Sequence, residues 1–245
     1  MKYFKLLLIS LAIITVAACS KKAPEDYAYK IMFMEQEQFV EPYPTRVIVT
    51  PEFLRFDDGD GAEDFILFDR KLSLIHSVVV EEQTIMTVHK KDSKAESPIK
   101  LKFTENDLGE MKDAPKVGGQ YPRHYQLLVN DEVCNDLIAV NGLLPAAVSA
   151  LKDFSILMAS DSKETLSNIP ADVLNACDLA QDTFAPTRQL MFGFPVQTMG
   201  RREYARTLVD FDENYKVDKK LFVLPVDYKR YTVQELRDGK VKFDK

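Results

Sequence analysis

The sequence predicts an α+β fold, in which an antiparallel β-meander forms an open half-barrel and a helical insertion packs against the sheet. Three observations indicate this arrangement. Short apolar or alternating segments separated by turn signals fill the chain from Tyr27 to Asn130. An apolar stripe at helical spacing follows in the middle of the chain, and strand character returns after Pro186.

The first group of candidate strands is joined by connections too short to hold crossover helices. This excludes a parallel sheet for that region and favours an antiparallel meander. The sequence Asp58-Gly59-Asp60-Gly61 is a strong turn signal between two of the strands. Strands are expected at residues 29–34, 45–50, 53–57, 64–69, 72–80 and 83–89, at the alternating Ile99, Leu101 and Phe103, and at 125–130. The polar segment 105–122 is expected to be a long loop.

The middle of the chain is expected to be helical, and Pro145 suits a first helical turn. The apolar stripe of the first helix comprises Leu144, Ala147, Val148, Leu151, Phe154 and Met158. A second helix is expected to begin at Pro170 and to place Val173, Leu174 and Cys177 on one side. A shorter helix is expected to hold Val133, Cys134 and Leu137. The last strands are expected at 189–194, 204–211 and 221–224, with turns at Gly200-Arg201 and near Asn214.

The N-terminus has the features of an export signal. Lys2 and Lys5 form a short positive region, the apolar stretch 6–18 follows, and small residues precede Cys19. The stretch is too short for a stable membrane-spanning anchor. We therefore expect residues 1–18 to be a signal peptide and residues 19–26 a tether. A single domain over 27–245 should follow, because no Gly/Ser-rich or Pro-rich linker interrupts that part.

The residues Val16-Ala17-Ala18-Cys19 resemble the lipobox of bacterial lipoproteins. The resemblance implies that Cys19 is the lipid anchor, with acyl chains such as palmitate, and that it becomes the mature N-terminus. Ser20 follows, where the enterobacterial sorting rule would need Asp for inner-membrane retention, so the outer membrane is implied. We thus expect a lipid-anchored, periplasm-facing protein of the cell envelope. The alternative is a plain signal peptide with Cys19 near the cut by coincidence.

The order of the elements, taken with the lipobox, resembles the carrier and receptor of lipoprotein localisation (LolA/LolB-like). That fold is an open antiparallel half-barrel lidded by helices. The layout also resembles uncharacterised bacterial lipoproteins. The resemblance rests on element order and not on a motif within the body, so it assigns no functional residue.

The cysteines indicate a disulfide. Lipidation of Cys19 would leave Cys134 and Cys177, and an even pair in an exported chain is most simply a disulfide. Two buried free thiols are the alternative. The absence of a C-x-x-C sequence argues against a redox-active site.

The sequence contains no recognisable catalytic motif, and we expect no catalytic residues, no metal and no cofactor. His76 lies on the apolar face of a strand, where a core histidine is the ordinary interpretation and a ligand or base the other. The acidic run 57–64 is either a solvated hairpin turn or a weak cation site. The Phe192-Gly193-Phe194-Pro195 sequence either lines an aromatic pocket or ends a packed strand.

These observations favour a non-catalytic envelope lipoprotein that binds an apolar or acyl ligand between the sheet and the helices. The residues expected to bind the ligand are Leu144, Val148, Leu151, Phe154, Phe192 and Phe194. The alternative function is a structural or assembly factor that binds a protein partner in the envelope. A net charge of −6 argues against nucleic acid as a partner and leaves the lipid as the means of membrane attachment.

Overall fold

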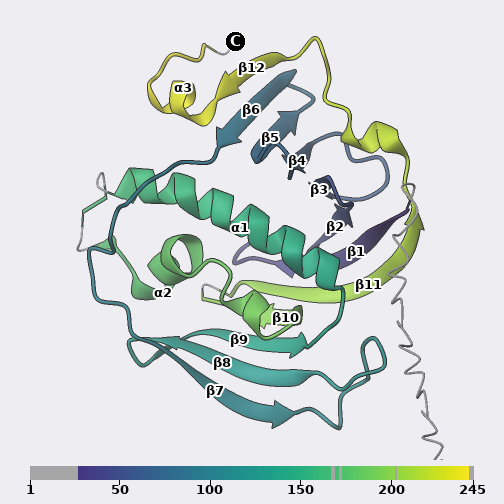
Figure 1. The fold of residues 1–245 in the computed structure, drawn as a ribbon, viewed down its shortest axis with the longest axis vertical. Helices are drawn as coiled ribbons and strands as arrows, with labels where there is room; N and C mark the ends of the chain where they lie inside the picture. Colours follow the sequence, from purple (N-terminus) through teal and green to yellow (C-terminus); the bar gives the residue numbers. More distant parts are fainter. Residues whose placement is uncertain (1–26, 167–168, 171–172, 202, 243–245) are drawn as a thin grey trace, which may run out of the picture.

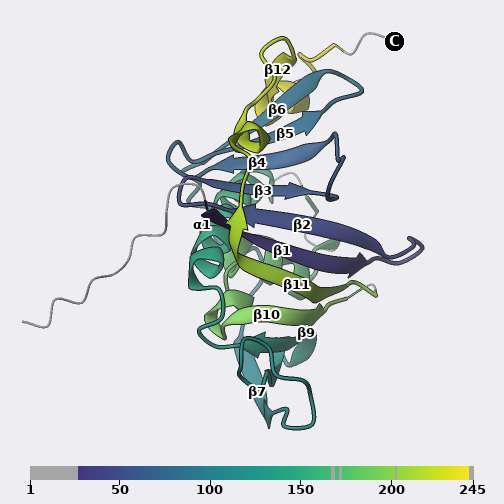
Figure 2. The same ribbon diagram turned by 90° about the vertical axis from the view of Figure 1, so that its right-hand side faces the viewer.

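The computed structural model describes residues 27–166, 169–170, 173–201 and 203–242. These residues form one open sheet of twelve strands with three α-helices (Figures 1 and 2). The predicted signal peptide, Cys19 and the tether lie outside the described residues. The sheet order is β12-β6-β5-β4-β3-β2-β1-β11-β10-β9-β8-β7.

The first six strands form the predicted antiparallel meander, in which each strand pairs with the next. They are β1 (Tyr27–Gln36), β2 (Tyr43–Val49), β3 (Phe53–Asp57), β4 (Phe65–Asp69), β5 (Leu74–Val79) and β6 (Thr84–His89). Local turns join them, and the predicted turn after Asp57 connects β3 to β4. The segment after β6 then crosses to the far edge of the sheet (Figure 1).

A second antiparallel group occupies that far edge: β7 (Phe103–Glu110), β8 (Arg123–Val129) and β9 (Glu132–Val140). The two groups are joined by β10 (Phe194–Met199), which pairs with β9, and β11 (Ala205–Lys216), which pairs with both β10 and β1. The centre of the sheet is therefore built from strands that are distant in the sequence. Glu35 of β1 and Arg206 of β11, for example, are directly opposite each other.

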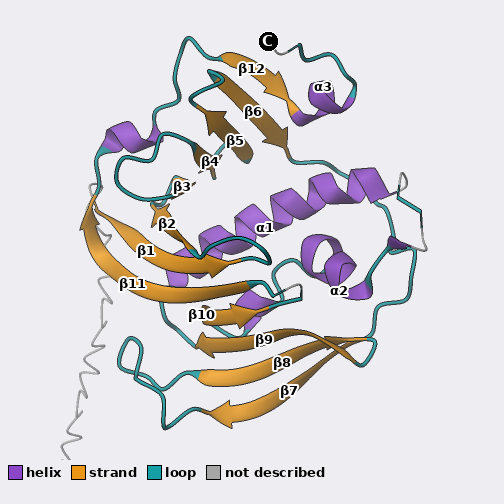
Figure 3. Cartoon of the chain, turned by 180° about the vertical axis from the view of Figure 1, so that it is seen from behind, coloured by secondary structure: helices purple, strands orange, loops and turns teal. Residues whose placement is uncertain are grey.

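Helix α1 (Pro145–Thr165) lies against one face of the sheet (Figures 1 and 3). It begins with Pro145 in its first turn, as predicted, and Leu144 before it adopts a left-handed conformation with φ 45°. Ala147, Ala150 and Leu157 turn to the sheet and join a core with Ile31, Val47 and other residues of the meander. Small residues at two of these positions let the helix backbone approach the strands closely.

The C-terminal segment covers the other face of the meander. A 3-10 turn (Lys219–Phe222) places Phe222 against Phe53, with ring centroids 5.2 Å apart. The chain then forms β12 (Lys229–Thr232), which pairs parallel to β6, and α3 (Val233–Arg237). Arg237 of α3 forms an ion pair with Asp161 of α1 at 2.6 Å, which attaches the C-terminal segment to that helix. The C-terminal segment thus contacts the face opposite α1 through its 3-10 turn and then passes the β6 edge to reach α1.

Beneath this C-terminal segment lies a buried group of charges. The Asp57 carboxylate, which has no exposed surface, accepts from Arg46 at 2.7 Å and from Arg55 at 2.5 Å. Burial alone raises the pKa of Asp57, but the two guanidinium groups outweigh it and hold this pKa below its usual range. Arg55 also lies over the Phe65 ring and donates to the carbonyl of Leu221 at 2.7 Å. The group therefore ties the C-terminal segment to the sheet.

Several predicted elements are wrong. Residues Val133, Cys134 and Leu137 belong to β9 and not to a helix, because they pair with β8 and β10 on either side. The expected loop 105–122 is too long at its start, because residues 105–110 belong to strand β7, whose exposed polar residues gave no apolar alternation, whereas 111–122 connects β7 to β8 outside the named elements. Ile99 and Leu101 precede that strand and lie outside it. The expected turn near Asn214 lies within the twelve-residue β11.

The helical insertion also differs in detail. The second helix, α2 (Ala176–Leu179), begins after Asn175 and not at Pro170, because the Asn175 side chain accepts from Cys177 N at 2.8 Å and caps it. A π-helical turn (Ala180–Phe184) continues it. Residues 189–191 form a 3-10 turn at the start of the expected strand 189–194. The expected strand 221–224 is also wrong, because 221–222 end the 3-10 turn Lys219–Phe222 and 223–224 follow it without regular structure.

Candidate functional site

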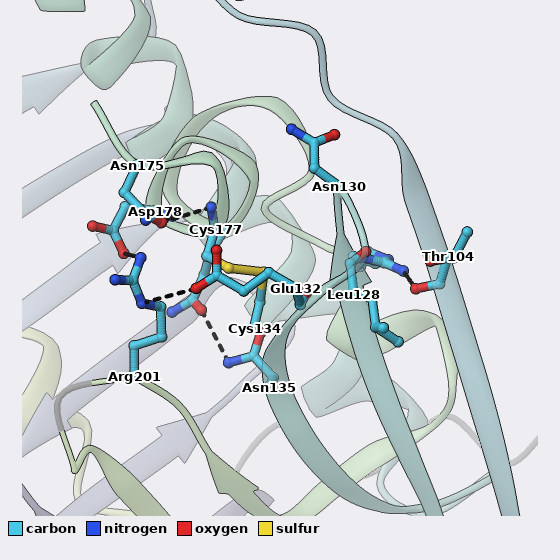
Figure 4. Close-up of a disulfide and its surroundings, with 12 residues drawn as sticks. Thr104, Leu128, Asn130, Glu132, Cys134, Asn135, Asn175, Cys177, Asp178 and Arg201 are labelled. Carbon is cyan, nitrogen blue, oxygen red and sulfur yellow. Dashed lines mark hydrogen bonds and ion pairs between the residues drawn. A yellow bond between two sulfur atoms is a disulfide. The ribbon is translucent and has the colours of Figure 1, made fainter. Parts of the chain in front are cut away.

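The predicted disulfide between Cys134 and Cys177 is present, with the two Cα atoms 5.3 Å apart (Figure 4). It joins strand β9 to helix α2, and not two helices as expected. Asn135 of the same strand donates to Gln181 at 3.1 Å, and Arg201 lies near Glu132 and Asp178 (Figure 4). These contacts hold the segment 176–184 against the sheet, beside the C-terminal half of α1.

Two neighbouring clefts open beside α1, each of about 440 Å³. The first lies where β1 to β5 end and includes Phe56, Ile66 and Val79. The second lies between α1, the 3-10 turn Gln189–Met191 and β10, and includes Leu151, Met158 and Leu190. Phe154 of α1 and Arg206 of β11 line both clefts. The two clefts therefore share a boundary and can serve one elongated ligand.

The floor of the second cleft is aromatic. Phe33 and Phe194 stack with ring centroids 6.1 Å apart, and both line the cleft. Phe194 is placed by Gly193, which has φ +119° and approaches the backbone of Val140 so closely that a Cβ would lie 2.4 Å from its carbonyl oxygen. The glycine lets the chain turn into β10 at this point.

A polar group stands at the boundary between the clefts. Arg206 donates to Glu35 at 2.7 Å, and the Tyr204 hydroxyl donates to the other oxygen of Glu35 at 3.1 Å. Burial raises the pKa of Tyr204 to about 12, with a further contribution from Glu35. The Arg206 guanidinium lies 5.1 Å from the centre of the Phe33 ring. A cleft with an aromatic floor, polar wall residues such as Asp182, and the Arg206–Glu35 pair at its boundary can bind an apolar molecule that has a polar end.

The six predicted ligand-binding residues are divided by the structure. Leu151, Phe154 and Phe194 line the second cleft. Leu144 is buried in the core at the start of α1, and Val148 packs beside that core. Phe192 packs on Tyr125, with ring centroids 4.6 Å apart. None of these last three residues lines either of the two clefts.

Three residues of the clefts, Glu35, Tyr204 and Arg206, were not predicted from the sequence. One signal was available, because Glu35 continues the alternation of Ile31 and Phe33 and so places a carboxylate on an apolar face of β1. Its partner could not be found in this way, because Arg206 lies 171 residues further along the chain.

The remaining candidate residues lie outside the clefts or are held by other contacts. His76 is buried on β5, and its Nδ1 is 3.0 Å from the Thr87 hydroxyl, in agreement with a core histidine. In the acidic run, Asp57 and Asp60 contact Arg46, and Asp64 accepts from Val80 N. Among the described residues, no group of three or more His, Cys, Asp or Glu side chains could hold a metal ion. Within the same residues, no helix is long and apolar enough to cross a membrane.

Comparisons with known proteins give little beyond these observations. No protein-family model matches the chain, and no curated protein matches it. Among solved structures, an uncharacterised conserved protein from Thermus thermophilus has a TM-score of 0.44 at 8% identity, over 84% of this chain and 91% of that one. PNGF-II has a TM-score of 0.40 at 10% identity, over 86% of this chain and 32% of its own length.

MucB has a TM-score of 0.38 at 8% identity, over 84% of this chain and 60% of its own length. All three TM-scores lie below 0.5, so neither a family nor a function follows from these similarities.

Proposed function

We propose that this protein is a non-catalytic lipoprotein of the bacterial cell envelope that binds an apolar or acyl ligand between the sheet and α1. In this proposal the open sheet is the half-barrel that the sequence predicts, and α1 is its lid. The observation that supports it most is the pair of clefts that share Phe154 and Arg206. The aromatic floor of the second cleft and the volume of both clefts suit a chain of methylene groups.

The ligand proposal is tested by purifying the protein from native membranes and identifying co-purified lipids by native mass spectrometry. We expect a bound acyl lipid on the wild-type protein. In a Ser155→Trp variant the indole would fill the second cleft, which Ser155 lines, and the lipid should be lost. Ile156→Trp is the matched control, because Ile156 lies on the same helix, is 47% exposed and lines neither cleft. Wild-type protein without lipid would contradict the proposal.

The proposed location rests on Cys19, with residues 1–18 as the signal peptide and the outer membrane as the destination. Two acyl chains or more hold a protein on a membrane far better than one. Labelled palmitate should be incorporated into the wild-type protein and not into Cys19→Ser, and globomycin should block processing. A Cys19→Ser protein that still sediments with membranes would contradict the anchor.

The alternative function, binding of an envelope protein, is favoured by one separate observation. Strand β7 pairs only with β8 among the described residues, and Phe103 and Leu108 on it are 41% and 52% exposed. Such an edge can accept a strand from a partner. Site-specific crosslinking in cells from Leu108 and from Phe154 would separate the two functions, because a protein adduct at Leu108 supports this one and a lipid adduct at Phe154 the first.

A further inference from the structure

The Arg206 guanidinium, at the mouth of the clefts, has N–H donors that its ion pair with Glu35 does not use. Among the described residues it forms one ion pair, from Nη2 to Glu35, and its Nε is buried and has no hydrogen-bond partner. The side chain lines both clefts and remains 30% exposed. A planar guanidinium presents five N–H donors, so a ligand in the clefts can accept at least one further hydrogen bond.

The charge of this guanidinium is already compensated. Glu35 has only 8% of its side chain exposed and lies 2.7 Å from it. The first cleft is also bordered by Asp58 and Asp64, neither of which forms an ion pair among the described residues, whereas the charges of Asp57 and Asp60 are balanced by those of Arg46 and Arg55. The field at the mouth is therefore negative, which opposes a second carboxylate while leaving a neutral acceptor unaffected.

We propose that the clefts select an uncharged acyl ester over a free fatty acid, with the ester carbonyl accepting a hydrogen bond from Arg206. The acyl chain lies along Phe154 and over Phe33 and Phe194, and the uncharged head group faces the carboxylates at the mouth. Glu35 sets the preference, since it removes the positive charge that would otherwise attract a carboxylate. This inference rests on the proposed function and adds the chemical class of the ligand.

The first experiment measures binding of three probes of equal chain length to the wild-type protein. These are 1-monopalmitoylglycerol, palmitate and hexadecylamine, each below its aggregation concentration, and binding is followed by displacement of a fluorescent acyl probe at pH 7.5. We expect 1-monopalmitoylglycerol to bind about tenfold more tightly than palmitate, because both can accept from Arg206 but the carboxylates at the mouth repel only the palmitate carboxylate. Equal binding of the two, tighter palmitate, or tightest binding of hexadecylamine would overturn the inference and leave the proposed function standing.

Two variants test the residues named. Glu35→Gln keeps an acceptor for Tyr204 but leaves Arg206 uncompensated, so palmitate should gain about tenfold and lose its disadvantage. Arg206→Met keeps the apolar stem of the side chain and should lower binding of 1-monopalmitoylglycerol about tenfold. Arg123→Met is the control for loss of an arginine, because Arg123 pairs with Asp107 on β7, away from the clefts, and should change neither affinity.

The outcomes separate the inference from the proposed function. If none of the three probes binds the folded wild-type protein, the proposed function fails and the inference fails with it. If the probes bind but Glu35→Gln, shown to be folded by circular dichroism, leaves the ratio of the two affinities unchanged, only the inference fails. The wild-type comparison remains decisive where a variant does not fold.

Discussion

The two groups of hairpins in this sheet differ in how they are covered. Strands β2 to β5 lie between α1 on one face and the C-terminal segment on the other, and three consecutive residues of β2, Val47 to Val49, are buried. Strand β7 at the far edge is exposed at most of its positions. The covered strands show near-continuous apolar runs, whereas the edge strand has a polar sequence.

This contrast shows two ways of holding a strand in one sheet. The meander β1–β6 is held by burial of apolar side chains and by the charges around Asp57. The β7–β9 group depends more on point attachments: the disulfide to α2, and Arg188, which donates to the carbonyls of Leu128 and Thr104. Substitutions in the two groups should therefore have unequal effects on stability.

The largest difference is expected for two phenylalanines. Phe68 of β4 is 2% exposed and packs edge-on against Phe154, so Phe68→Ala should lower the free energy of unfolding by about 3–5 kcal/mol. Phe103 of β7 is 41% exposed, and Phe103→Ala should cost less than about 1 kcal/mol. Denaturant unfolding monitored by circular dichroism measures both. Similar losses would show that the edge is as tightly packed as the meander.

The disulfide should have the next largest effect, and a local one. Its loop spans 43 residues, for which the chain-entropy model gives a loss of about 4 kcal/mol in a Cys134→Ser/Cys177→Ser double variant. We expect hydrogen exchange to accelerate most in β8, β9 and α2, and least in β2 to β5. An equal acceleration throughout the sheet would mean that the two groups unfold as one unit.

Substitution of Asp57 should lower the stability of the meander, because Asp57 holds the buried charges on the face opposite α1. Asp57→Asn leaves the buried Arg55 without a carboxylate and leaves Arg46 only the exposed Asp60, so it should cost about 3 kcal/mol. Asp107→Asn removes a partner from Arg123 at the exposed edge, where solvent screens the pair, and should not measurably change the melting temperature. A large effect of Asp107→Asn would contradict the contrast between the groups.

The smallest effect expected is a pH dependence from His76. Burial, with a contribution from Arg230, lowers the pKa of His76 below its ordinary value of 6.5. The unfolded chain therefore binds a proton at a pH where the folded chain does not, so stability falls as the pH drops below about 6.5 and levels off below the folded pKa. His76→Gln should reduce this loss in urea unfolding measured between pH 7.5 and 5. An unchanged pH profile would show that His76 is not the source.

Local sequence signals predicted much of the meander correctly. The strand 53–57 was predicted with its observed bounds, and the Asp58-Gly59-Asp60-Gly61 turn connects it to β4 as expected. Antiparallel neighbours joined by short turns are specified by residues close in sequence, which is why periodicity and turn chemistry suffice there. Strand β9 was misassigned because apolar residues at 133, 134 and 137 are compatible with a helix until β8 and β10 pair with them.

Residues close together in the chain thus specify the antiparallel hairpins and the start of the long helix at Pro145, and an even pair of cysteines indicates the disulfide. The placement of β11 beside β1, and with it the meeting of Arg206 and Glu35 at the mouth of two clefts, emerges only in the folded chain. Pairing between strands so far apart depends on how the whole chain buries its apolar faces, because no local preference of either strand specifies its distant neighbour.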